Sequence, residues 1–454
     1  MSGATAAREN ATGATGADGG RKIGFWTCTA LVIGNVIGMG IFVLPASLAP
    51  YGFNALLGWA VVLAGALALA CVFSILARAL PDAGGPYGYI RHTLGDLPAY
   101  LSLWAYWVSV WITNAALATG VVGYLVAAFP SLGALPPIWF AQGLLWTLVA
   151  INLGGVRTGG GVQILTTALK LLPMLAIALL GGWLLLTAPA SYTAHLPATP
   201  ISLGGVTAAT SIALFAMLGV ESASVPAARV DAPARTIPRA TMIGTALAAL
   251  VYVVVSAVPL LLIRQPELAA TSAPFALVMD RFAAAGSGRW LALFVAISGL
   301  GALNGWTLLV GELTRTMADH GVLPAVLARH DRRGTPTLSL LVTGALSAAM
   351  IAMSYSKSLV SAFTFLTLLG TAANLPLYLC CALALMVLWR RRHRACATRG
   401  ALLAAAACVL FVAFAFAGAG REPFLCALGL VAAGLPLYAL MRRRRRAGAK
   451  ATPE

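Results

Sequence analysis

The stretch LVIGNVIGMGIFVLP occupies residues 31–45 and carries three glycines where an uninterrupted membrane-spanning helix would carry leucine or isoleucine. A second apolar stretch, TSIALFAMLGVESASV (210–225), contains the helix-breaking Gly219 and, two residues later, Glu221. A carboxylate at membrane depth is costly and is interpreted as functional by default. Two interrupted helices in corresponding places of two halves are the best sequence sign of a transporter site at the bilayer midplane. We therefore expect both helices to break inside the membrane.

The composition is that of a membrane protein. Of the 454 residues, 60% are hydrophobic and only 9% are charged, whereas soluble domains have about 25% charged residues. The formal net charge is +17, but the basic residues lie between apolar spans, so no basic soluble domain is expected to bind nucleic acid. The seven cysteines fall mostly in or beside apolar spans and are interpreted as packing residues. No dinucleotide-binding motif, phosphate-binding loop or metalloprotease motif occurs, which argues against an ATP-driven pump. The alternatives to a transporter are a membrane enzyme and a channel or sensor. An enzyme would need polar catalytic clusters that the sequence does not show, so we expect no enzyme, no catalytic residue, no cofactor and no metal.

Windows of about 20 apolar residues predict twelve membrane spans. The expected organisation is an all-α membrane protein in four segments. Residues 1–22 form a disordered cytoplasmic tail, residues 23–390 form the transport unit with spans 1–10, residues 400–441 form spans 11 and 12, and residues 442–454 form a basic cytoplasmic tail. The third, eighth and tenth spans are long enough to tilt.

The distribution of basic residues predicts the orientation. Placing the N-terminus inside puts 24 of the 30 lysines and arginines on the cytoplasmic side, so both termini are expected there. The terminal run Arg442 to Arg446 is a topology signal or binds anionic lipid. Near the inner end of span 8, Glu312 and Arg315 have the i, i+3 spacing of an ion pair on a helix.

Spans 1–5 and 6–10 can be arranged as two units of five. Because five is odd, the second unit enters the membrane from the opposite side, and the repeat is inverted. The first helix of each unit is the broken one. Free N–H groups at one break and free carbonyls at the other can hold the carboxylate and the amino group of an amino acid.

Five ordered stretches resemble signatures of the amino acid–polyamine–organocation (APC) superfamily. They are GNVIGMGIFVLPASLAPYG (34–52), GGPYGYIRHTLG (84–95), YWVSVWITNAAL (106–117), LGVESASVPAARVDAPARTIPRA (218–240) and GALNGWTLLVGELTRTMADHGVLPAVLARHDRRGTPT (301–337). Within the superfamily, the chain is most similar to the basic amino acid/polyamine antiporter family. This resemblance implies twelve transmembrane helices in a 5+5 inverted repeat with helices 1 and 6 broken, an arrangement that is often a homodimer. It also implies exchange by alternating access in a bacterial-type inner membrane.

The resemblance also implies roles for particular residues. It assigns the cradle for the substrate carboxylate to Val36, Gly38, Met39 and Gly40 of the first helix. The other residues that it places at the substrate site are Asn114, Phe215, Leu218 and Trp306, and those that it places in gating are Tyr106 and Glu221.

The chemistry of these residues suits a basic substrate, although each has a structural alternative. Trp306 can attract a cation through its ring, and Glu221 can supply a counter-charge or a titrating group that couples protons to closure. Plain packing is the alternative for Trp306, a purely structural role is the alternative for Glu221, and an interhelical hydrogen bond is the alternative for Asn114. Phe215 replaces a tryptophan of the family, and Leu369 and Leu377 replace a serine and a tyrosine. The distal pocket is therefore expected to be more apolar, which favours a shorter amine or a neutral side chain.

Lys170 lies in the sequence TTALKLLPM (166–174), about 15 Å into the fifth predicted span. It resembles a lysine that takes the place of a sodium ion in neutral and proton-coupled branches of the superfamily. Carbonyls near Gly38 to Gly40 and the hydroxyl of Ser298 are its expected partners, and proton coupling is its expected role. The alternative is a lysine that extends to the membrane surface.

The expected function is secondary-active exchange of cationic amino acids, their decarboxylated amines, or both, of the arginine/agmatine or ornithine/putrescine type. The alternative is a proton-coupled transporter or exchanger of neutral amino acids, which Lys170 and the apolar distal pocket favour. The expected partners are an amino acid or amine substrate, the lipid bilayer and a second copy of the chain, and nucleic acid is not among them.

Overall fold

The computed structural model describes residues 24–83, 85–134, 136–154, 159–220, 233–331, 334–354 and 356–450. Within these ranges the chain forms helices and turns and no β-strand, as expected for an all-α protein. The α-helices are α2 (Phe25–Val36), α3 (Gly40–Leu48), α4 (Phe53–Ala79), α5 (Pro86–Leu94), α6 (Asp96–Ala128), α7 (Pro137–Leu153), α8 (Gly159–Thr187), α9 (Ala190–Thr193), α10 (Leu203–Leu214), α11 (Pro233–Leu262), α12 (Gln265–Ala270), α13 (Pro274–Phe282), α14 (Ser287–Asp319), α15 (Thr337–Met353), α16 (Leu359–Arg390), α17 (Arg399–Gly418), α18 (Arg421–Ala432) and α19 (Gly434–Lys450). The short 3₁₀ turns η1 (Ala49–Tyr51), η4 (Phe215–Met217) and η7 (Ala325–Ala328) follow α3, α10 and α14.

Eight helical segments in the described part of the chain are long and apolar enough to cross a membrane. They are Phe53–Ala79, Asp96–Ala128, Leu169–Thr187, Pro238–Leu262, Ser287–Asp319, Leu359–Arg390, Arg399–Gly418 and Arg421–Arg443. The 27 residues of α4 extend for about 40 Å, more than the hydrocarbon core of about 30 Å. Shorter apolar helices, Gly40–Tyr51, Pro137–Leu153, Leu203–Met217 and Thr337–Met353, fall at the stretches predicted as spans 1, 4, 6 and 9, which are roughly 23–48, 136–155, 204–226 and 337–354.

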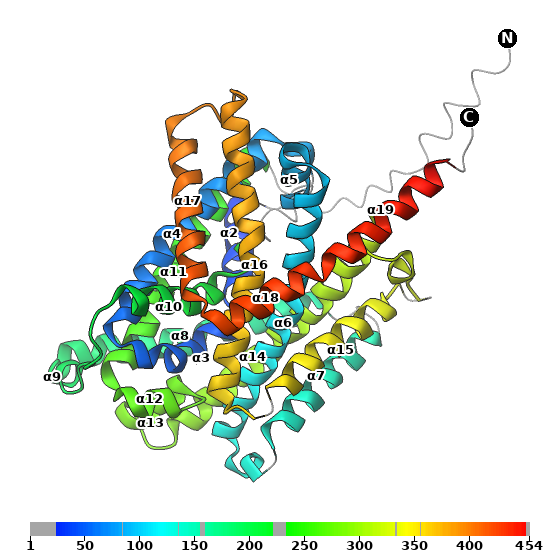
Figure 1. Cartoon of the computed structure of the whole chain (residues 1–454). Coiled ribbons are helices and arrows are strands. Elements are labelled where there is room, and N and C mark those ends of the chain that lie inside the picture. The colour runs from blue at the N-terminus through cyan, green and yellow to red at the C-terminus, as the bar shows by residue number, and fades with distance from the viewer. Residues whose placement is uncertain are drawn as a thin grey trace.

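Helix α6 runs through the centre of the molecule. Its most apolar window is 83% buried, whereas the corresponding window of the last span is only 17% buried and lies at the periphery. Helices α14 and α16 pack along α6, and α7 and α15 lie side by side next to it (Figure 1). On the other side, α4 and α17 pack against α10. Helix α16 packs against both α3 and α10, and α6 packs against α3, so the centre of the molecule adjoins the two interrupted helices.

Two side-chain amides link the segments at the end of the molecule where α12 and α13 lie (Figure 1). Asn54 donates to the carbonyls of Tyr51 and Pro200, at 2.9 and 3.0 Å, and accepts from the N–H of Ser202 at 2.9 Å. Gln265 donates to the carbonyl of Ala49 at 2.9 Å. These bonds attach the start of α10 and the start of α12 to the turn after α3.

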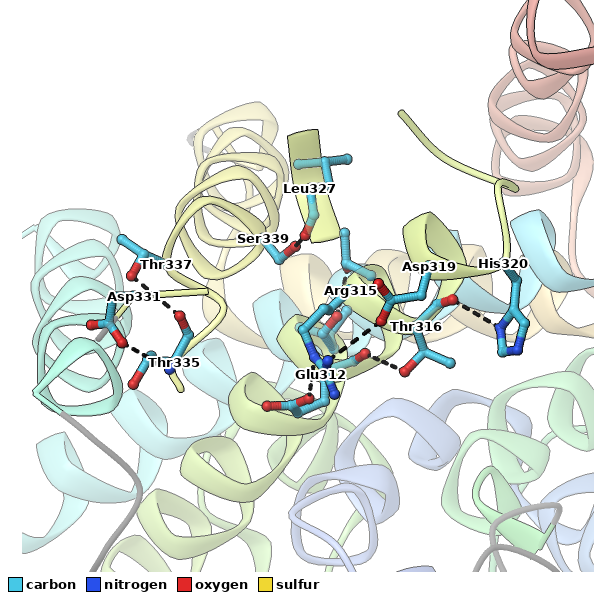
Figure 2. A network of polar contacts seen from close by, with 12 residues as sticks. Glu312, Arg315, Thr316, Asp319, His320, Leu327, Asp331, Thr335, Thr337 and Ser339 are labelled. Carbon is cyan, nitrogen blue, oxygen red and sulfur yellow. Dashed lines mark hydrogen bonds and ion pairs between the residues drawn. The ribbon is translucent and has the colours of Figure 1, made fainter. Parts of the chain in front are cut away.

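A second polar network lies where α14 ends (Figure 2). The ion pair expected from the i, i+3 spacing is confirmed, because Arg315 Nε lies 3.0 Å from a carboxylate oxygen of Glu312. Asp319 also contacts Arg315, at 3.4 Å. Farther along, Ser339 at the start of α15 donates to the carbonyl of Leu327 at 2.8 Å. The ion pairs of Arg315 therefore stay within α14, whereas the bond from Ser339 joins α15 to η7.

The structure describes most of the predicted C-terminal tail but none of the predicted N-terminal tail. Residues 1–23 lie outside the described residues. The basic run that begins at Arg442 continues α19, which extends from Gly434 to Lys450.

Candidate functional site

The first interruption lies between α2 and α3. Helix α2 ends at Val36, and Ile37 adopts an extended conformation with φ −70° and ψ 100°. Helix α3 begins at Gly40, and no side chain caps its N-terminus. The break expected from the glycines in this span is therefore present, and it leaves backbone N–H groups without side-chain partners.

The second interruption follows α10. The helix ends at Leu214, the turn η4 follows, and Leu218 is extended with φ −63° and ψ 137°. Gly219 has φ +106°, a conformation that residues with a side chain rarely adopt, which explains the requirement for glycine. Glu221 belongs to 221–232, which lie outside the described residues. Its predicted role in gating and proton coupling stays a prediction.

A small cavity lies between the two interruptions. The residues that line it are Val36, Gly38, Gly40, Thr113, Leu117, Phe215, Ala216, Leu218 and Trp306. Six of the predicted site residues are thus brought together, whereas Thr113, Leu117 and Ala216 were not predicted. The cavity measures about 20 Å³, which is room for roughly one water molecule. An amino acid needs far more space, so the lining must move apart to admit one.

Phe215 covers the break in the first span. A Cβ added to Gly40 would lie only 3.0 Å from the edge of the Phe215 ring, so a larger residue at position 40 would force that ring to shift. On its other side, the Phe215 ring packs against Phe363 of α16. The two rings meet edge to face, with their centroids 5.9 Å apart. Movement of Phe215 would therefore enlarge the cavity toward α16.

The helix ends at the cavity have opposite partial charges. The N-terminus of α3 at Gly40 carries the positive end of its helix dipole, and the C-terminus of α10 at Phe215 carries a negative end. Both residues line the cavity. The arrangement can bind a carboxylate at one end and an ammonium group at the other, which are the two charged groups of an α-amino acid.

Tyr252 on α11 is a residue at the site that sequence reasoning missed. Its side chain is fully buried, and its hydroxyl donates a 2.9 Å hydrogen bond to the carbonyl of Val36. The same hydroxyl accepts a hydrogen bond from the backbone N–H of Gly38. One side chain thus contacts both the last residue of α2 and a residue within the first interruption. The sequence offers no signal for this role, because a lone tyrosine in an apolar span is equally compatible with packing.

Three other predicted residues do not line the cavity. Met39 is fully buried, and its side chain packs beside Gly120 and Gly299. Asn114 is 1% exposed, and its Oδ1 atom has no hydrogen-bond partner among the described residues. Tyr106 is half-buried about two helical turns before the cavity-lining part of α6, and its carbonyl accepts a bond from Ser109. The functions assigned to these residues stay predictions.

Lys170 is enclosed by protein and is only 3% exposed. A lysine that extended to the membrane surface would be more accessible than this, so the burial supports an internal role. Helix α8 packs against α14, which carries Ser298. The hydrogen bond that we expected between the two residues is not formed, because the Ser298 hydroxyl has no partner in the described part of the chain. The shared helix contact alone does not bring a short hydroxyl within reach.

Helix α16 carries a group of buried polar residues that sequence reasoning also missed. Thr367, Thr371 and Asn374 are at most 1% exposed. Both threonine hydroxyls and both polar atoms of the Asn374 amide lack hydrogen-bond partners within the described ranges. Each unpaired buried group costs about 1–3 kcal/mol. The signal was available in the sequence, because three polar residues within eight positions are unusual in an apolar span.

Comparison with known proteins adds independent information. A family model described as "Amino acid permease" matches residues 23–427. The chain is 29% identical to a putative arginine/ornithine antiporter of Bacillus subtilis (strain 168), over 92% of this chain and 96% of that protein. It is 34% identical to the cadaverine/lysine antiporter of Escherichia coli (strain K12), over 74% and 76% of the two chains. It is 28% identical to the putrescine transporter PotE of the same strain, over 81% and 84%.

Proposed function

Because the chain belongs to the amino acid permease family, we propose that it is a secondary-active exchanger of cationic amino acids, their decarboxylated amines, or both. The observation that carries this proposal is the cavity between the two interrupted helices, which has helix ends of opposite polarity and Trp306 in its wall. The names of the three relatives describe transport of basic amino acids or diamines, which supports the choice of substrate class.

In the proposed binding mode, the substrate carboxylate lies at the N-terminus of α3, near Gly40. The α-ammonium group lies near the last carbonyls of α10 and η4, and the side chain extends toward Trp306. Cation–π attraction to a desolvated tryptophan is worth about 2 kcal/mol. Glu221 provides the counter-charge or the titrating group, and Lys170 contributes to proton coupling.

The proposed transport cycle is alternating access in a twelve-helix arrangement. Spans 1–5 and 6–10 form the inverted repeat, and the two units move relative to each other around the cavity. Both termini lie in the cytoplasm of a bacterial-type inner membrane, because most basic residues then face inward. We also propose that two copies of the chain associate as a homodimer.

A panel of labelled substrates tests the proposal. Purified protein in proteoliposomes should take up arginine, lysine, ornithine or a diamine when one of these compounds is present inside. Strong uptake of neutral amino acids driven by a pH gradient, with no uptake of basic compounds, would replace this proposal with proton-coupled neutral transport.

A tryptophan substitution tests the binding mode itself. We expect Trp306→Leu to weaken apparent affinity for basic substrates by about 2 kcal/mol, or roughly thirtyfold. Trp139→Leu on α7 is the matched control, because Trp139 is 68% exposed at the periphery and does not line the cavity. Equal affinities in the two variants would remove Trp306 from the proposed site.

A further inference from the structure

The three buried polar residues Thr367, Thr371 and Asn374, called here the α16 polar group, lie beside the substrate cavity. Phe363, Thr367, Gly370 and Asn374 are spaced by four, three and four residues, so they share one face of α16. This face adjoins Phe215, which lines the cavity. Phe363 contacts Phe215, and a Cβ added to Gly370 would lie 3.8 Å from Phe215.

A contact to α6 defines the position more closely. The same added Cβ at Gly370 would lie 3.6 Å from the hydroxyl of Thr113, which lines the cavity. Asn374 is one turn beyond Gly370, and Thr367 is about one turn before it. Thr367 and Asn374 therefore lie about one turn on either side of the point where α16 meets two residues of the cavity wall.

The unpaired atoms of this group need partners that the closed cavity does not supply. Burying such atoms without hydrogen bonds is unfavourable, and native proteins keep few of them. The space of about 20 Å³ is too small for a substrate, so Phe215 must move when one enters. Because Phe215 packs against Phe363 and lies near Gly370, movement of its ring would open the cavity toward the face of α16 that carries Thr367 and Asn374.

We propose that the α16 polar group binds the terminal ammonium group of a basic amino acid or diamine during transport. This inference rests on the proposed function and specifies its substrate class. The segment Leu359–Trp389 contains no charged residue, so the group offers neutral oxygen acceptors. An ammonium has three donors that separate hydroxyl and amide oxygens can accept. A planar guanidinium is instead best matched by a carboxylate, which this face lacks.

The test compares lysine with norleucine, which has the same chain without the terminal ammonium. Each compound is used to inhibit lysine exchange in proteoliposomes by the wild-type protein, Asn374→Leu and Thr371→Val. We expect both variants to lose lysine-over-norleucine preference, by about tenfold or more for Asn374→Leu, because a hydrogen bond to a charged group is removed. Inhibition by norleucine should not change.

The control variant is Thr343→Val on α15. Thr343 is equally buried, but its hydroxyl already donates to the carbonyl of Ser339 at 2.8 Å. Its lysine preference should equal that of the wild type. In contrast to a purely structural role, the proposal also predicts that Asn374→Leu and Thr371→Val remain as stable as the wild type or become more stable, because unpaired polar atoms are removed.

Three results would overturn the inference. The first is an unchanged lysine preference in correctly inserted Asn374→Leu and Thr371→Val proteins, which would leave the proposed function intact. The second is an equal loss in Thr343→Val, which would indicate a general packing effect. The third is a wild-type protein that does not prefer lysine over norleucine at all, which would reject the proposed function together with this inference.

Discussion

Replacing Tyr252 with phenylalanine removes a single hydroxyl from the first helix interruption. Because α2 ends at Val36, the Val36 carbonyl has no donor farther along its own helix, and the Tyr252 hydroxyl at 2.9 Å is the partner that the structure gives it. The substitution leaves that buried carbonyl unpaired, which costs about 1–3 kcal/mol. The geometry of the break also changes at the cavity wall, so we expect the KM for exchange to rise.

Tyr192→Phe provides the matched control. The Tyr192 hydroxyl donates a slightly shorter bond, 2.7 Å, to the carbonyl of Gly181. Gly181 lies inside α8, where its carbonyl keeps a helical donor, so we expect a loss of only about 0.5–1.5 kcal/mol. Tyr192 is only partly buried and does not line the cavity, so the KM should not change.

The assay for both variants is SDS titration in mixed micelles, which gives the free energy of unfolding, together with exchange kinetics in proteoliposomes. The reasoning predicts a larger destabilisation and a higher KM for Tyr252→Phe than for Tyr192→Phe. Equal unfolding free energies with an unchanged KM would refute the idea that this hydroxyl holds the interruption in place.

Three further outcomes follow from the described contacts. Gly40→Ala should reduce exchange and cost about 1–3 kcal/mol in unfolding free energy, because the new Cβ would meet the Phe215 ring at 3.0 Å; a variant with wild-type exchange would show that the ring yields freely. Asn54→Ala should lower the unfolding free energy by about 1–3 kcal/mol, because three hydrogen bonds are lost, and unchanged SDS titration would contradict this. The hydrogen bond from Arg281, followed by its charge, lowers the pKa of Glu267. This pair therefore stabilises the fold above the ordinary pKa of glutamate, and the effect is lost as pH falls through the lowered pKa. Because the side chains are 38% and 35% exposed, Glu267→Gln should cost no more than about 1 kcal/mol near neutral pH and nothing in acid; an equal cost at both pH values would exclude the ion pair as the cause.

The interruptions could be predicted from the sequence because they depend on residue types with special backbone properties. Glycines at 38 and 40, and Gly219 with its positive φ, indicate breaks wherever the surrounding helices lie. The resemblance to basic amino acid/polyamine antiporters is likewise confirmed by the relatives, because the motifs that carry it are local runs of sequence.

The rotation of each helix about its axis could not be predicted in the same way. Successive residues on a helix point about 100° apart, so a choice between Thr113 and Asn114 as the cavity residue depends on how α6 packs. The structure places Thr113 and Leu117, which are one turn apart, in the cavity wall. On α16 the sequence comparison directed attention to Leu369 and Leu377, whereas the polar residues share the face of Phe363.

Long-range contacts were the least predictable feature. Tyr252 reaches Val36 across 216 positions in the chain, and its role follows only from the packing of α11 against α2. The hydrogen bond expected between Lys170 and Ser298 is absent from the structure for the same reason. Contact between α8 and α14 does not by itself bring two particular side chains within hydrogen-bond distance.

Counterflow of labelled lysine tests the central claim most directly. Proteoliposomes are prepared with unlabelled lysine inside, or with none, and uptake of external labelled lysine is followed over time. Obligatory exchange through the cavity between the interrupted helices predicts rapid uptake only in the loaded vesicles. Equal uptake into empty and loaded vesicles, or none into either by correctly folded protein, would contradict the account.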